Sequence, residues 1–407
     1  MSDVLVIGGG FAGVWAAAGA VRARHEAGLP DDAVRVTLVD AADDMVIRPR
    51  LYEPDPGRMR VALDRVLGPI GVRRVAATVT GIDTATRHVS ALGRDGLPLE
   101  LGYDRLVLAT GSRVVAPPLD GAEHLFDVDT MPAAAALDSH IGRLPTLPGD
   151  GRFTAVVVGG GFTGIEVATE LPGRLRAAAG GAEVRVVLVE QADVVGPELG
   201  PGPRPEILAA LAHAGVEVRL GVRLASLDRD RATLSDGTVI PTRTAVWTAG
   251  MRASGLTAQI PGTRDELGRL AVDEYMRVVG VDGVYAAGDT AAAVAENGHV
   301  VMQSCQHAVP QGKLAGANVG ADVLGLPLAS FSPNPYVTCL DLGPYGAVLT
   351  LGWDREIAQT GAEAKQLKQS INADWIYPPV DDAAAILALA DHRITWPTEA
   401  PVVDPRA

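Results

Sequence analysis

The chain has 407 residues, of which 47% are hydrophobic and 21% charged, a composition typical of a globular protein and not of a disordered or fibrous one. At roughly 150 residues per domain, this length predicts two or three domains. The 49 acidic and 35 basic residues give a net charge of -14, which disfavours binding to nucleic acid or to an anionic membrane surface. We therefore expect small molecules or proteins as partners.

The beginning of the chain shows no targeting pattern. Met1 is followed by a short apolar run and a glycine cluster, without the basic and long apolar regions of a signal peptide, so we expect a cytoplasmic protein. Every apolar run is interrupted before the roughly 18 residues that span a bilayer, so no transmembrane segment is predicted. The only two cysteines, Cys305 and Cys339, lack CxxC spacing, and the eight histidines are dispersed. These patterns predict neither a disulfide framework nor a metal site.

An internal repeat is the strongest organisational signal. Residues 4–13 read VLVIGGGFAG and residues 155–164 read AVVVGGGFTG, which are identical at six of ten positions. Each copy is a β-branched run typical of a buried parallel strand, followed by glycines and then by an apolar, helix-like stretch. A second strand ending in an acid follows each time, at Asp40 and at Glu190. The repeat therefore predicts two βαβ nucleotide-binding units.

Each copy contains the pattern GxGxxG, formed by Gly8, Gly10 and Gly13 and by Gly159, Gly161 and Gly164. The first glycine permits a tight turn, the second lets the backbone approach a diphosphate, and the third lets helix and strand pack closely. Unpaired N–H groups and the dipole of the following helix favour the anionic diphosphate. Glycine turns without a ligand are the alternative, which the presence of two such copies disfavours.

Acidic residues near each fingerprint predict how a dinucleotide would be held. Asp40, 27 residues after Gly13, and Glu190 would accept hydrogen bonds from ribose hydroxyls. Glu190 would repel the 2′-phosphate of NADPH, and Gln191 supplies no cation, so NADH is predicted over NADPH; a solvated acid at a strand end is the alternative. Glu166, in the first turns of the second helix, either complements the helix dipole or contacts the nicotinamide end.

A family resemblance is carried by five segments: Gly8 to Gly13 with Asp40, Ala109-Thr110-Gly111, Gly159 to Glu166, Trp247-Thr248-Ala249-Gly250, and Ala287-Gly288-Asp289. Together they resemble the FAD-dependent pyridine nucleotide-disulfide oxidoreductase family, which has two dinucleotide-binding domains, and most closely its type II NADH dehydrogenase branch. The resemblance covers roughly residues 1–325. It implies that the first repeat binds FAD, the second binds NADH, and the Gly288-Asp289 corner returns to hold the flavin's ribityl chain and phosphate.

The resemblance implies an α/β fold with two Rossmann-like domains, as in glutathione reductase, and a smaller C-terminal α+β unit. We expect the FAD-binding domain to comprise residues 1–115 and 251–325 and the NADH-binding domain to comprise residues 116–250. The C-terminal interface or acceptor unit would then comprise residues 326–407.

The resemblance also implies the residues of both cofactor sites. For FAD they are Gly8, Gly10, Phe11, Ala12, Gly13, Asp40, Arg48, Val79, Ala109, Thr110, Gly111, Gly288, Asp289, Gln306 and His307. For NADH they are Gly159, Gly161, Phe162, Thr163, Gly164, Glu166, Glu190 and Gly250. Glu166, Gln306 and His307 are the catalytic candidates, with packing as the alternative role of His307. Arg48 and Arg50 could bind the cofactor or an anionic acceptor, and the alternative is that both are surface charges.

Residues 305–312 read CQHAVPQG and match the place where the family begins a helix pointed at the flavin. We expect Pro310 as its first residue, where the missing N–H would be unpaired anyway, and the nearby free N–H groups would stabilise reduced flavin. Quinone-reducing members read Ala-Gln-x-Ala-x-Gln here, and this chain has Cys305 for the first Ala and Pro310 for the second Gln. The difference predicts slow reaction with quinones.

We therefore predict an FAD-dependent oxidoreductase that takes hydride from NADH to flavin N5 and passes electrons to an unidentified acceptor. A quinone-like small molecule, free flavin, a partner protein and oxygen all remain open as acceptors. A redox sensor that binds FAD and NADH but turns over slowly is the alternative. Cys305 and Cys339 could still meet in space as a redox pair, as in sulfide-oxidising relatives, but those relatives lack a functional second fingerprint and this chain has one.

The C-terminal unit bears on membrane docking. From Asp381 onward the chain has five acids and two arginines, so docking on an anionic membrane is not expected. One amphipathic stretch either lies on a surface or packs on the flavin domain or on the second subunit of a homodimer. It comprises Leu367, Ile371 and Trp375 with Lys365 and Lys368 beside them.

Overall fold

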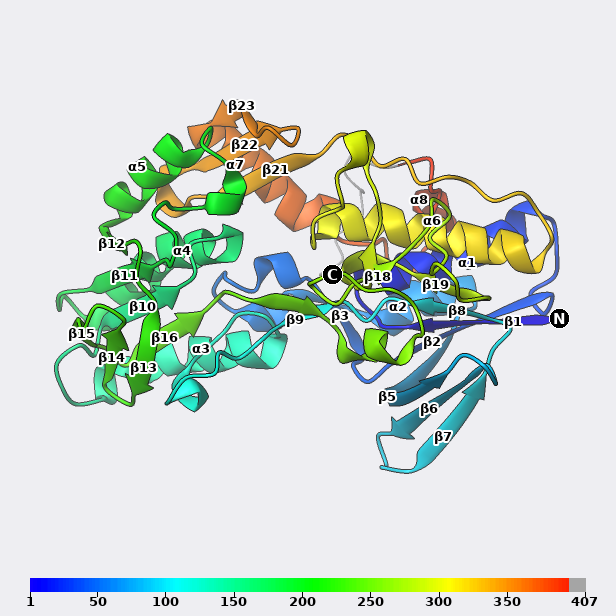
Figure 1. Ribbon diagram of the computed structural model, residues 1–407, viewed down its shortest axis with the longest axis horizontal. Helices are drawn as coiled ribbons and strands as arrows, with labels where there is room; N and C mark the ends of the chain where they lie inside the picture. The colour runs from blue at the N-terminus through cyan, green and yellow to red at the C-terminus, as the bar shows by residue number, and fades with distance from the viewer. Residues whose placement is uncertain (395–407) are drawn as a thin grey trace.

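The computed structural model describes residues 1–394. A mixed sheet and a parallel sheet lie at opposite ends of the long axis of the molecule (Figure 1). The C-terminal hairpins lie above the helices of the second sheet. This arrangement confirms the predicted α/β fold. The end of the acidic tail, with Glu399 and Asp404, lies outside the described residues.

The sheet of the first repeat has seven strands within residues 1–394, in the order β19-β8-β1-β2-β5-β6-β7. They are β1 (Ser2–Ile7), β2 (Val34–Asp40), β5 (Arg73–Asp83), β6 (His88–Gly93), β7 (Pro98–Gly102), β8 (Arg105–Leu108) and β19 (Val284–Ala286). β1 pairs in parallel with both β2 and β8, and β19 pairs in parallel with β8, whereas β6 is antiparallel to both β5 and β7. Because β1 is covered on both faces, its residues Val4 to Ile7 are all buried, as expected for an unbroken apolar strand.

Two helices pack on this sheet with their backbones in close contact. They are α1 (Phe11–Glu26) and α6 (Cys305–Val323). A Cβ added at Gly312 would lie 2.3 Å from the carbonyl oxygen of Ala12, and one added at Gly316 would lie 2.1 Å from that of Ala16. Glycine at both positions therefore lets α6 lie directly against the helix that begins at the first fingerprint.

The second repeat forms a parallel sheet in the order β12-β11-β10-β16 among the described residues. The strands are β10 (Thr154–Val158), β11 (Arg185–Val189), β12 (Val216–Arg219) and β16 (Thr244–Trp247). The helices beside them are α3 (Met131–Arg143), α4 (Phe162–Ala179) and α5 (Arg204–Ala214). A small antiparallel sheet follows, with β13 (Leu224–Asp228), β14 (Arg231–Leu234) and β15 (Val239–Pro241).

The chain passes between the two halves twice, and the two crossings pair with each other. β9 (Ser112–Val114) is antiparallel to β17 (Met251–Ala253). The pairing joins the halves by backbone hydrogen bonds. The predicted domain boundaries at residues 115, 250 and 325 remain predictions.

The C-terminal unit consists of a three-stranded antiparallel sheet and helices within the part of the chain up to residue 394. Its elements are β21 (Val337–Asp341), β22 (Ala347–Leu351), β23 (Glu356–Thr360), α7 (Gly361–Ser370), a π-helical turn (Ile371–Trp375) and α8 (Ala383–Leu389). The sheet and α7 lie over α4, whereas α8 returns to α1, where Arg22 donates to the carbonyl oxygen of Leu387 at 2.7 Å. The unit therefore contacts both halves of the molecule.

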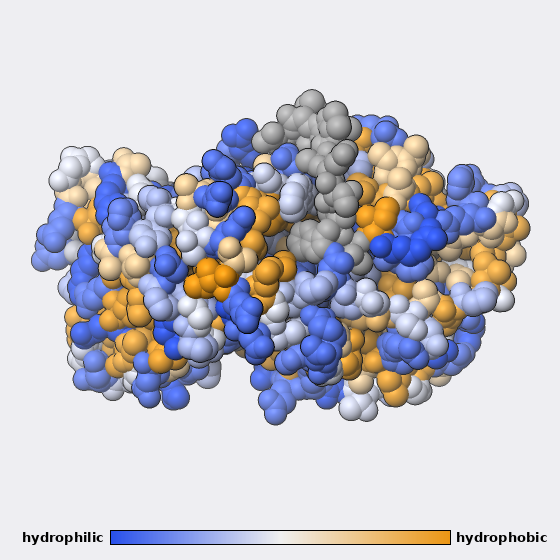
Figure 2. Space-filling view, turned by 90° about the horizontal axis from the view of Figure 1, so that it is seen from above, coloured by the Kyte–Doolittle hydropathy of each residue, from blue (hydrophilic) through white to orange (hydrophobic). Residues whose placement is uncertain are grey.

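None of the helices in residues 1–394 is long and apolar enough to cross a bilayer. The face of the molecule seen in Figure 2 has hydrophobic residues interspersed with hydrophilic ones over both halves.

Candidate flavin and dinucleotide sites

The first fingerprint has the backbone geometry that a dinucleotide cradle requires. Gly8 has φ +110°, a conformation that favours glycine, and a Cβ at Gly13 would lie 1.8 Å from the carbonyl oxygen of Gly8. Nothing lies within 4 Å of the place where a Cβ of Gly10 would stand. Gly13 therefore serves the packing of strand and helix, while Gly10 leaves open space at the N-terminus of α1.

The acid at the end of the second strand is held by the fingerprint loop in both repeats. Asp40 accepts hydrogen bonds from the backbone N–H of Gly9 at 2.6 Å and of Ala42 at 2.7 Å. Glu190 does the same with Gly160 at 2.6 Å and Ala192 at 2.8 Å. The repeat in the sequence is thus also a repeat in hydrogen bonding, and both acids stand at the carboxyl ends of their strands, where α/β folds bind nucleotides.

Three buried polar atoms without partners among the described residues favour a polar ligand on the first half. They are Oγ1 of Thr110, Nε2 of His307 and Nε2 of Gln311. Gln311 accepts from the N–H of Gly288 at 3.0 Å, so its other amide atom is the free one. Because a buried polar atom without a partner costs free energy, these residues fit a group with many polar atoms, such as FAD.

Arg48 and Asp289, both predicted to bind FAD, lie together. Arg48 forms ion pairs with Asp129 and, at 3.4 Å, with Asp289, and the hydroxyl of Ser112 donates to Asp289 at 2.6 Å. Burial raises the pKa of the Asp289 carboxyl, although the Ser112 hydrogen bond and the Arg48 charge oppose this rise. Arg48 is therefore part of a partly buried cluster, and the alternative of a free surface charge is wrong for it.

Arg50 is committed to contacts within the protein. Its guanidinium pairs with Glu53 at 2.6 Å and donates to the Tyr377 hydroxyl at 3.0 Å and to the carbonyl oxygen of Asn372 at 3.2 Å. It therefore ties the segment after β3 (Asp44–Val46) to the C-terminal unit.

Glu166 is buried beneath the C-terminal unit. Its Oε1 accepts from Lys368 Nζ at 2.9 Å and from the N–H of Asp341 at 3.2 Å. Burial raises the pKa of Glu166, and the Lys368 charge opposes that rise. Burial alone would lower the pKa of Lys368, but the charge and hydrogen bond of Glu166, together with the nearby Cys339 and Asp341, outweigh burial and raise this pKa. The dipole of α4 is thus not the only group that stabilises the charge of Glu166. The sequence did not identify Lys368, one of three lysines in the chain, as a site residue.

The amphipathic stretch around Lys368 faces the interior of the protein. Lys365 pairs with Asp341 at 2.5 Å, and Lys368 also donates to the carbonyl oxygen of Cys339 at 3.0 Å. Leu367, Ile371 and Trp375 are half-buried. The surface alternative is wrong, because both lysines are paired with acids of β21 and α4.

The helix near the flavin begins earlier than predicted. α6 starts at Cys305, with Ser304 in extended conformation before it, and Pro310 lies inside the helix. The expectation for Pro310 is wrong because the carbonyl of Ser304 already accepts from the N–H groups of His307 and Ala308, at 3.2 and 2.9 Å, five residues upstream. The free N–H groups of the helix therefore belong to its first residues, Cys305 and Gln306.

Gln306 and His307 both contact the start of the C-terminal unit. The Gln306 amide donates to the carbonyl oxygen of Val337 at 2.5 Å and accepts from its N–H at 3.0 Å. His307 stacks on Tyr336, with ring centroids 5.1 Å apart, and its Nδ1 accepts from the N–H of Met302 at 3.2 Å. Burial lowers the pKa of His307 to about 4, so its ring is neutral at pH 7. It can donate a hydrogen bond from Nε2, but it does not carry an acidic proton of imidazolium.

The two cysteines are free thiols in different elements, Cys305 at the start of α6 and Cys339 in β21. Burial raises the pKa of each to about 11, in spite of the nearby Lys368 charge. At neutral pH both are thiols and not the reactive thiolates that dithiol chemistry needs.

The other predicted binding residues lie at helix starts, after strand ends and, for Val79, in the middle of a strand. Phe11, Ala12, Phe162 and Thr163 begin α1 and α4; Ala109 and Gly111 follow β8, Val79 lies in β5, and Gly250 precedes β17 with φ +77°. These assignments remain predictions for the individual contacts.

A cation beside the second site was missed by the sequence analysis. Arg223 Nε donates to Gln191 Oε1 at 3.1 Å, which places a guanidinium next to the residue that follows Glu190. No local pattern indicated this, because 32 residues separate the two positions. A cation at this place would oppose the charge repulsion that Glu190 is predicted to exert on a 2′-phosphate.

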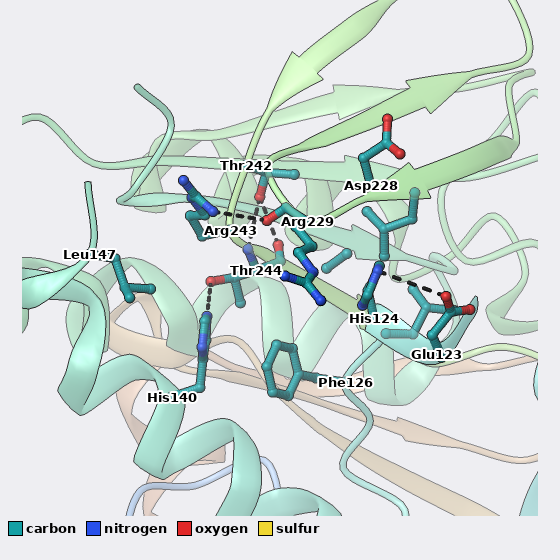
Figure 3. Close-up of a pocket in the computed structure, with 13 residues that line it drawn as sticks. Glu123, His124, Phe126, His140, Leu147, Asp228, Arg229, Thr242, Arg243 and Thr244 are labelled. Carbon is teal, nitrogen blue, oxygen red and sulfur yellow. Dashed lines mark hydrogen bonds and ion pairs between the residues drawn. The ribbon is translucent and has the colours of Figure 1, made fainter. Parts of the chain in front are cut away.

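A cavity of about 340 Å³ lies at the beginning of β16, lined by residues that include Phe126, His140 and Thr244 (Figure 3). Its polar groups largely satisfy one another: His140 Nε2 lies 3.1 Å from the Thr244 hydroxyl, and Arg243 donates to the carbonyl oxygen of Arg229 at 3.4 Å. Thr244 begins β16, whereas the fingerprint follows the carboxyl end of β10. The cavity is thus not the dinucleotide site.

The geometry agrees with comparisons to known proteins. The family described as pyridine nucleotide-disulphide oxidoreductase matches residues 2–312. An NADH dehydrogenase-like protein of Mycobacterium tuberculosis is 48% identical over 400 residues, covering 97% of this chain and 99% of that protein. Demethylphylloquinone reductase NdbB of a Synechocystis species is 27% identical over 359 residues, covering 85% of this chain and 86% of that protein.

A solved structure supports the fold. The structure of NDH2 from Plasmodium falciparum in complex with NADH superposes with a TM-score of 0.76 at 13% identity, covering 91% of this chain and 93% of that chain. With two fingerprints, their acids held alike and a 48% identical relative along nearly the whole length, this chain belongs to the pyridine nucleotide-disulfide oxidoreductase family and is an FAD-dependent NAD(P)H oxidoreductase that uses FAD and NADH.

Proposed function

We propose that this chain oxidises NADH bound at the second fingerprint, passes the hydride to FAD bound at the first, and delivers the electrons to a small-molecule acceptor. The observation that carries the proposal is the shared hydrogen-bonding pattern of Asp40 with Gly9 and of Glu190 with Gly160. Two equivalent cradles in one chain are what a reaction between two dinucleotides requires, since binding supplies proximity and orientation.

The protein groups have distinct roles in this proposal. FAD, when bound, supplies the capacity to accept a hydride and to release two electrons. The N-terminus of α4 binds the NADH diphosphate, and Glu190 orients the adenine-side ribose. The free N–H groups of Cys305 and Gln306 at the start of α6 stabilise negative charge at the flavin pyrimidine. Thr110 and Gln311 supply hydrogen bonds from buried side chains.

Glu166 connects the NADH side to the C-terminal unit. Since it is paired with Lys368 and lies one turn into α4, we propose that it positions the nicotinamide end and does not act as a free acid. This role agrees with the buried position of the pair, in which each charge is compensated by the other.

The acceptor is the open part of the proposal. The name of the Synechocystis relative makes a quinone the first acceptor to test. The residues at Cys305 and Pro310, where quinone-reducing members have Ala and Gln, favour slower reaction with quinones than with another acceptor such as free flavin or oxygen.

Rapid mixing tests both steps. The FAD-loaded protein is reduced anaerobically with NADH while flavin absorbance is followed, and the reduced protein is mixed with ubiquinone-1, menadione, FMN or oxygen. We expect fast bleaching by NADH and slower reoxidation by the two quinones than by FMN or oxygen. A double variant, Cys305→Ala with Pro310→Gln, should reoxidise faster with the two quinones and at an unchanged rate with FMN or oxygen.

The outcomes separate the alternatives. Quinone reoxidation as fast as reduction by NADH would contradict the expected acceptor preference. Bleaching that is slow with NADH, followed by slow reoxidation with every acceptor, would favour the redox sensor.

A further inference from the structure

The two fingerprints differ in the space above their second glycine. The position of a Cβ at Gly10 is open, with nothing within 4 Å. The equivalent position at Gly161 is 2.5 Å from Oε1 of Glu198, so a carboxylate lies over the cradle of the second repeat. Since the two loops otherwise match in sequence and hydrogen bonding, Glu198 is a specific feature of the NADH side.

The backbone around Glu198 is anchored. Glu198 lies in a short 3-10 turn (Pro197–Leu199), in which the Leu199 side chain is buried. The N–H of Gly196 donates to the carbonyl oxygen of Gly160 at 3.0 Å, and Arg355 Nη2 donates to the carbonyl oxygen of Glu198 at 3.4 Å. These contacts keep the turn against the fingerprint loop.

The carboxylate itself is not anchored. Within residues 1–394 the Glu198 side chain has no hydrogen bond or ion pair, and the residue is exposed. A flexible side chain of this kind can rotate away from Gly161 without disturbing the turn. Its location is favourable when no nucleotide is bound, because a negative group near the N-terminus of α4 complements the helix dipole.

The same location is unfavourable for nucleotide binding. The diphosphate of a dinucleotide belongs at the N-terminus of the helix after the fingerprint, beside the second glycine. Two negative groups cannot share this place without strong repulsion, since two like charges about 4 Å apart repel each other by several kilocalories per mole even near a protein surface.

We propose that the Glu198 carboxylate competes with the diphosphate for the N-terminus of α4 and must rotate away when NADH binds. The inference rests on the proposed binding of NADH at the second fingerprint. Glu198 then lowers the affinity for every nucleotide with a diphosphate and speeds release of oxidised NAD. It leaves binding of the uncharged adenosine part unchanged.

Calorimetric titration of the FAD-loaded protein tests this proposal. The ligands are NAD, ADP-ribose and adenosine, and the variants are Glu198→Gln, which keeps the shape and removes the charge, and Glu183→Gln. Glu183 is an exposed acid in the loop before β11, at the opposite end of that strand from Glu190. Its variant has the same net charge as Glu198→Gln. We expect Glu198→Gln to bind NAD and ADP-ribose roughly five- to tenfold more tightly at low salt, a gain of about 1–1.4 kcal/mol.

Adenosine and salt provide the internal checks. The affinity for adenosine should stay within about twofold in both variants, and the gain for ADP-ribose should shrink at 0.5 M salt, where screening weakens charge repulsion. The Glu183→Gln variant should bind all three ligands as the wild type does.

The experiment distinguishes failure of the role proposed for Glu198 from failure of the proposed NADH site. Equal or weaker binding of ADP-ribose by Glu198→Gln, with normal binding by the wild type, would overturn the role of Glu198 alone. If neither the wild type nor the variants bind NAD or ADP-ribose, the proposed NADH site itself is overturned.

Discussion

Lys368 Nζ lies 2.9 Å from Glu166 Oε1, and both side chains are about nine-tenths buried. The pair joins α7 of the C-terminal unit to α4, the helix that begins at the second fingerprint. Two residues 202 positions apart therefore connect the part of the chain that resembles no nucleotide-binding unit to the NADH side.

Removing one partner of this pair should destabilise the protein strongly. We expect Lys368→Met to lower the free energy of unfolding by about 3 kcal/mol or more, because it leaves the Glu166 carboxylate buried without its cation. The double variant with Glu166→Gln should recover part of the loss. Urea denaturation measures both effects.

Lys365→Met is the matched control, because the Lys365 side chain is a quarter exposed and its pair with Asp341 is more exposed than the pair of Lys368 with Glu166. We expect Lys365→Met to lower the free energy of unfolding by less than Lys368→Met does. An equal loss in the two single variants would argue against a special role of the buried pair.

Substitutions at Gly10 and at Gly13 of the first fingerprint should have different effects. Gly10→Val is expected to fold and to lose FAD, because its side chain would enter the open space that the diphosphate needs. Gly13→Ala should instead destabilise the fold, because its Cβ would collide with the backbone of Gly8. Flavin absorbance of the purified protein and its melting temperature distinguish the two. A yellow Gly10→Val protein would contradict the assigned FAD site.

Glu190 and Arg223 should act in opposite directions on cofactor choice. The wild type should reduce its flavin faster with NADH than with NADPH, and Glu190→Ala should narrow the difference by removing the charge repulsion and the ribose hydrogen bonds. Arg223→Gln should widen it, since the cation next to Gln191 is lost. Stopped-flow reduction with each cofactor gives the ratios, and equal kcat/KM values for the wild type would refute the assignment of Glu190.

His307 should make stability depend on pH. Its pKa is about 4 in the folded protein and about 6.5 when unfolded, so the unfolded state takes up a proton first as the pH falls. Stability is therefore lost between about pH 6.5 and pH 4, and we expect a loss of about 2 kcal/mol from this residue between pH 7.5 and pH 5.

The matched variant for this test is His307→Phe, which keeps a flat ring against Tyr336 and cannot be protonated. Urea denaturation at the two pH values should show a smaller loss for the variant than for the wild type. Equal losses would mean that His307 is not held neutral by the fold.

The sequence alone determined the parts of this protein that depend on neighbouring residues. A strand, a glycine turn and a helix are local structures, so the pattern from Val4 to Gly13 and its copy from Ala155 to Gly164 predicted both cradles. Each acid was equally predictable, because the end of the second strand of a βαβ unit returns beside the turn that follows the first. The resemblance then identified FAD and NADH as the cofactors.

Only the tertiary structure decided which distant side chains meet at those cradles. Lys368 reaches Glu166, Arg223 reaches Gln191, and Glu198 covers Gly161 because of how the C-terminal sheet and the loops pack. Sequence periodicity reports which face of an element is buried but not which element covers it. The predicted start of α6 was wrong for a local reason, since the carbonyl of Ser304 already accepts from the N–H groups of His307 and Ala308 and the helix begins five residues before Pro310. Only the tertiary structure shows that Gln306, in this first turn, contacts Val337 of the C-terminal unit.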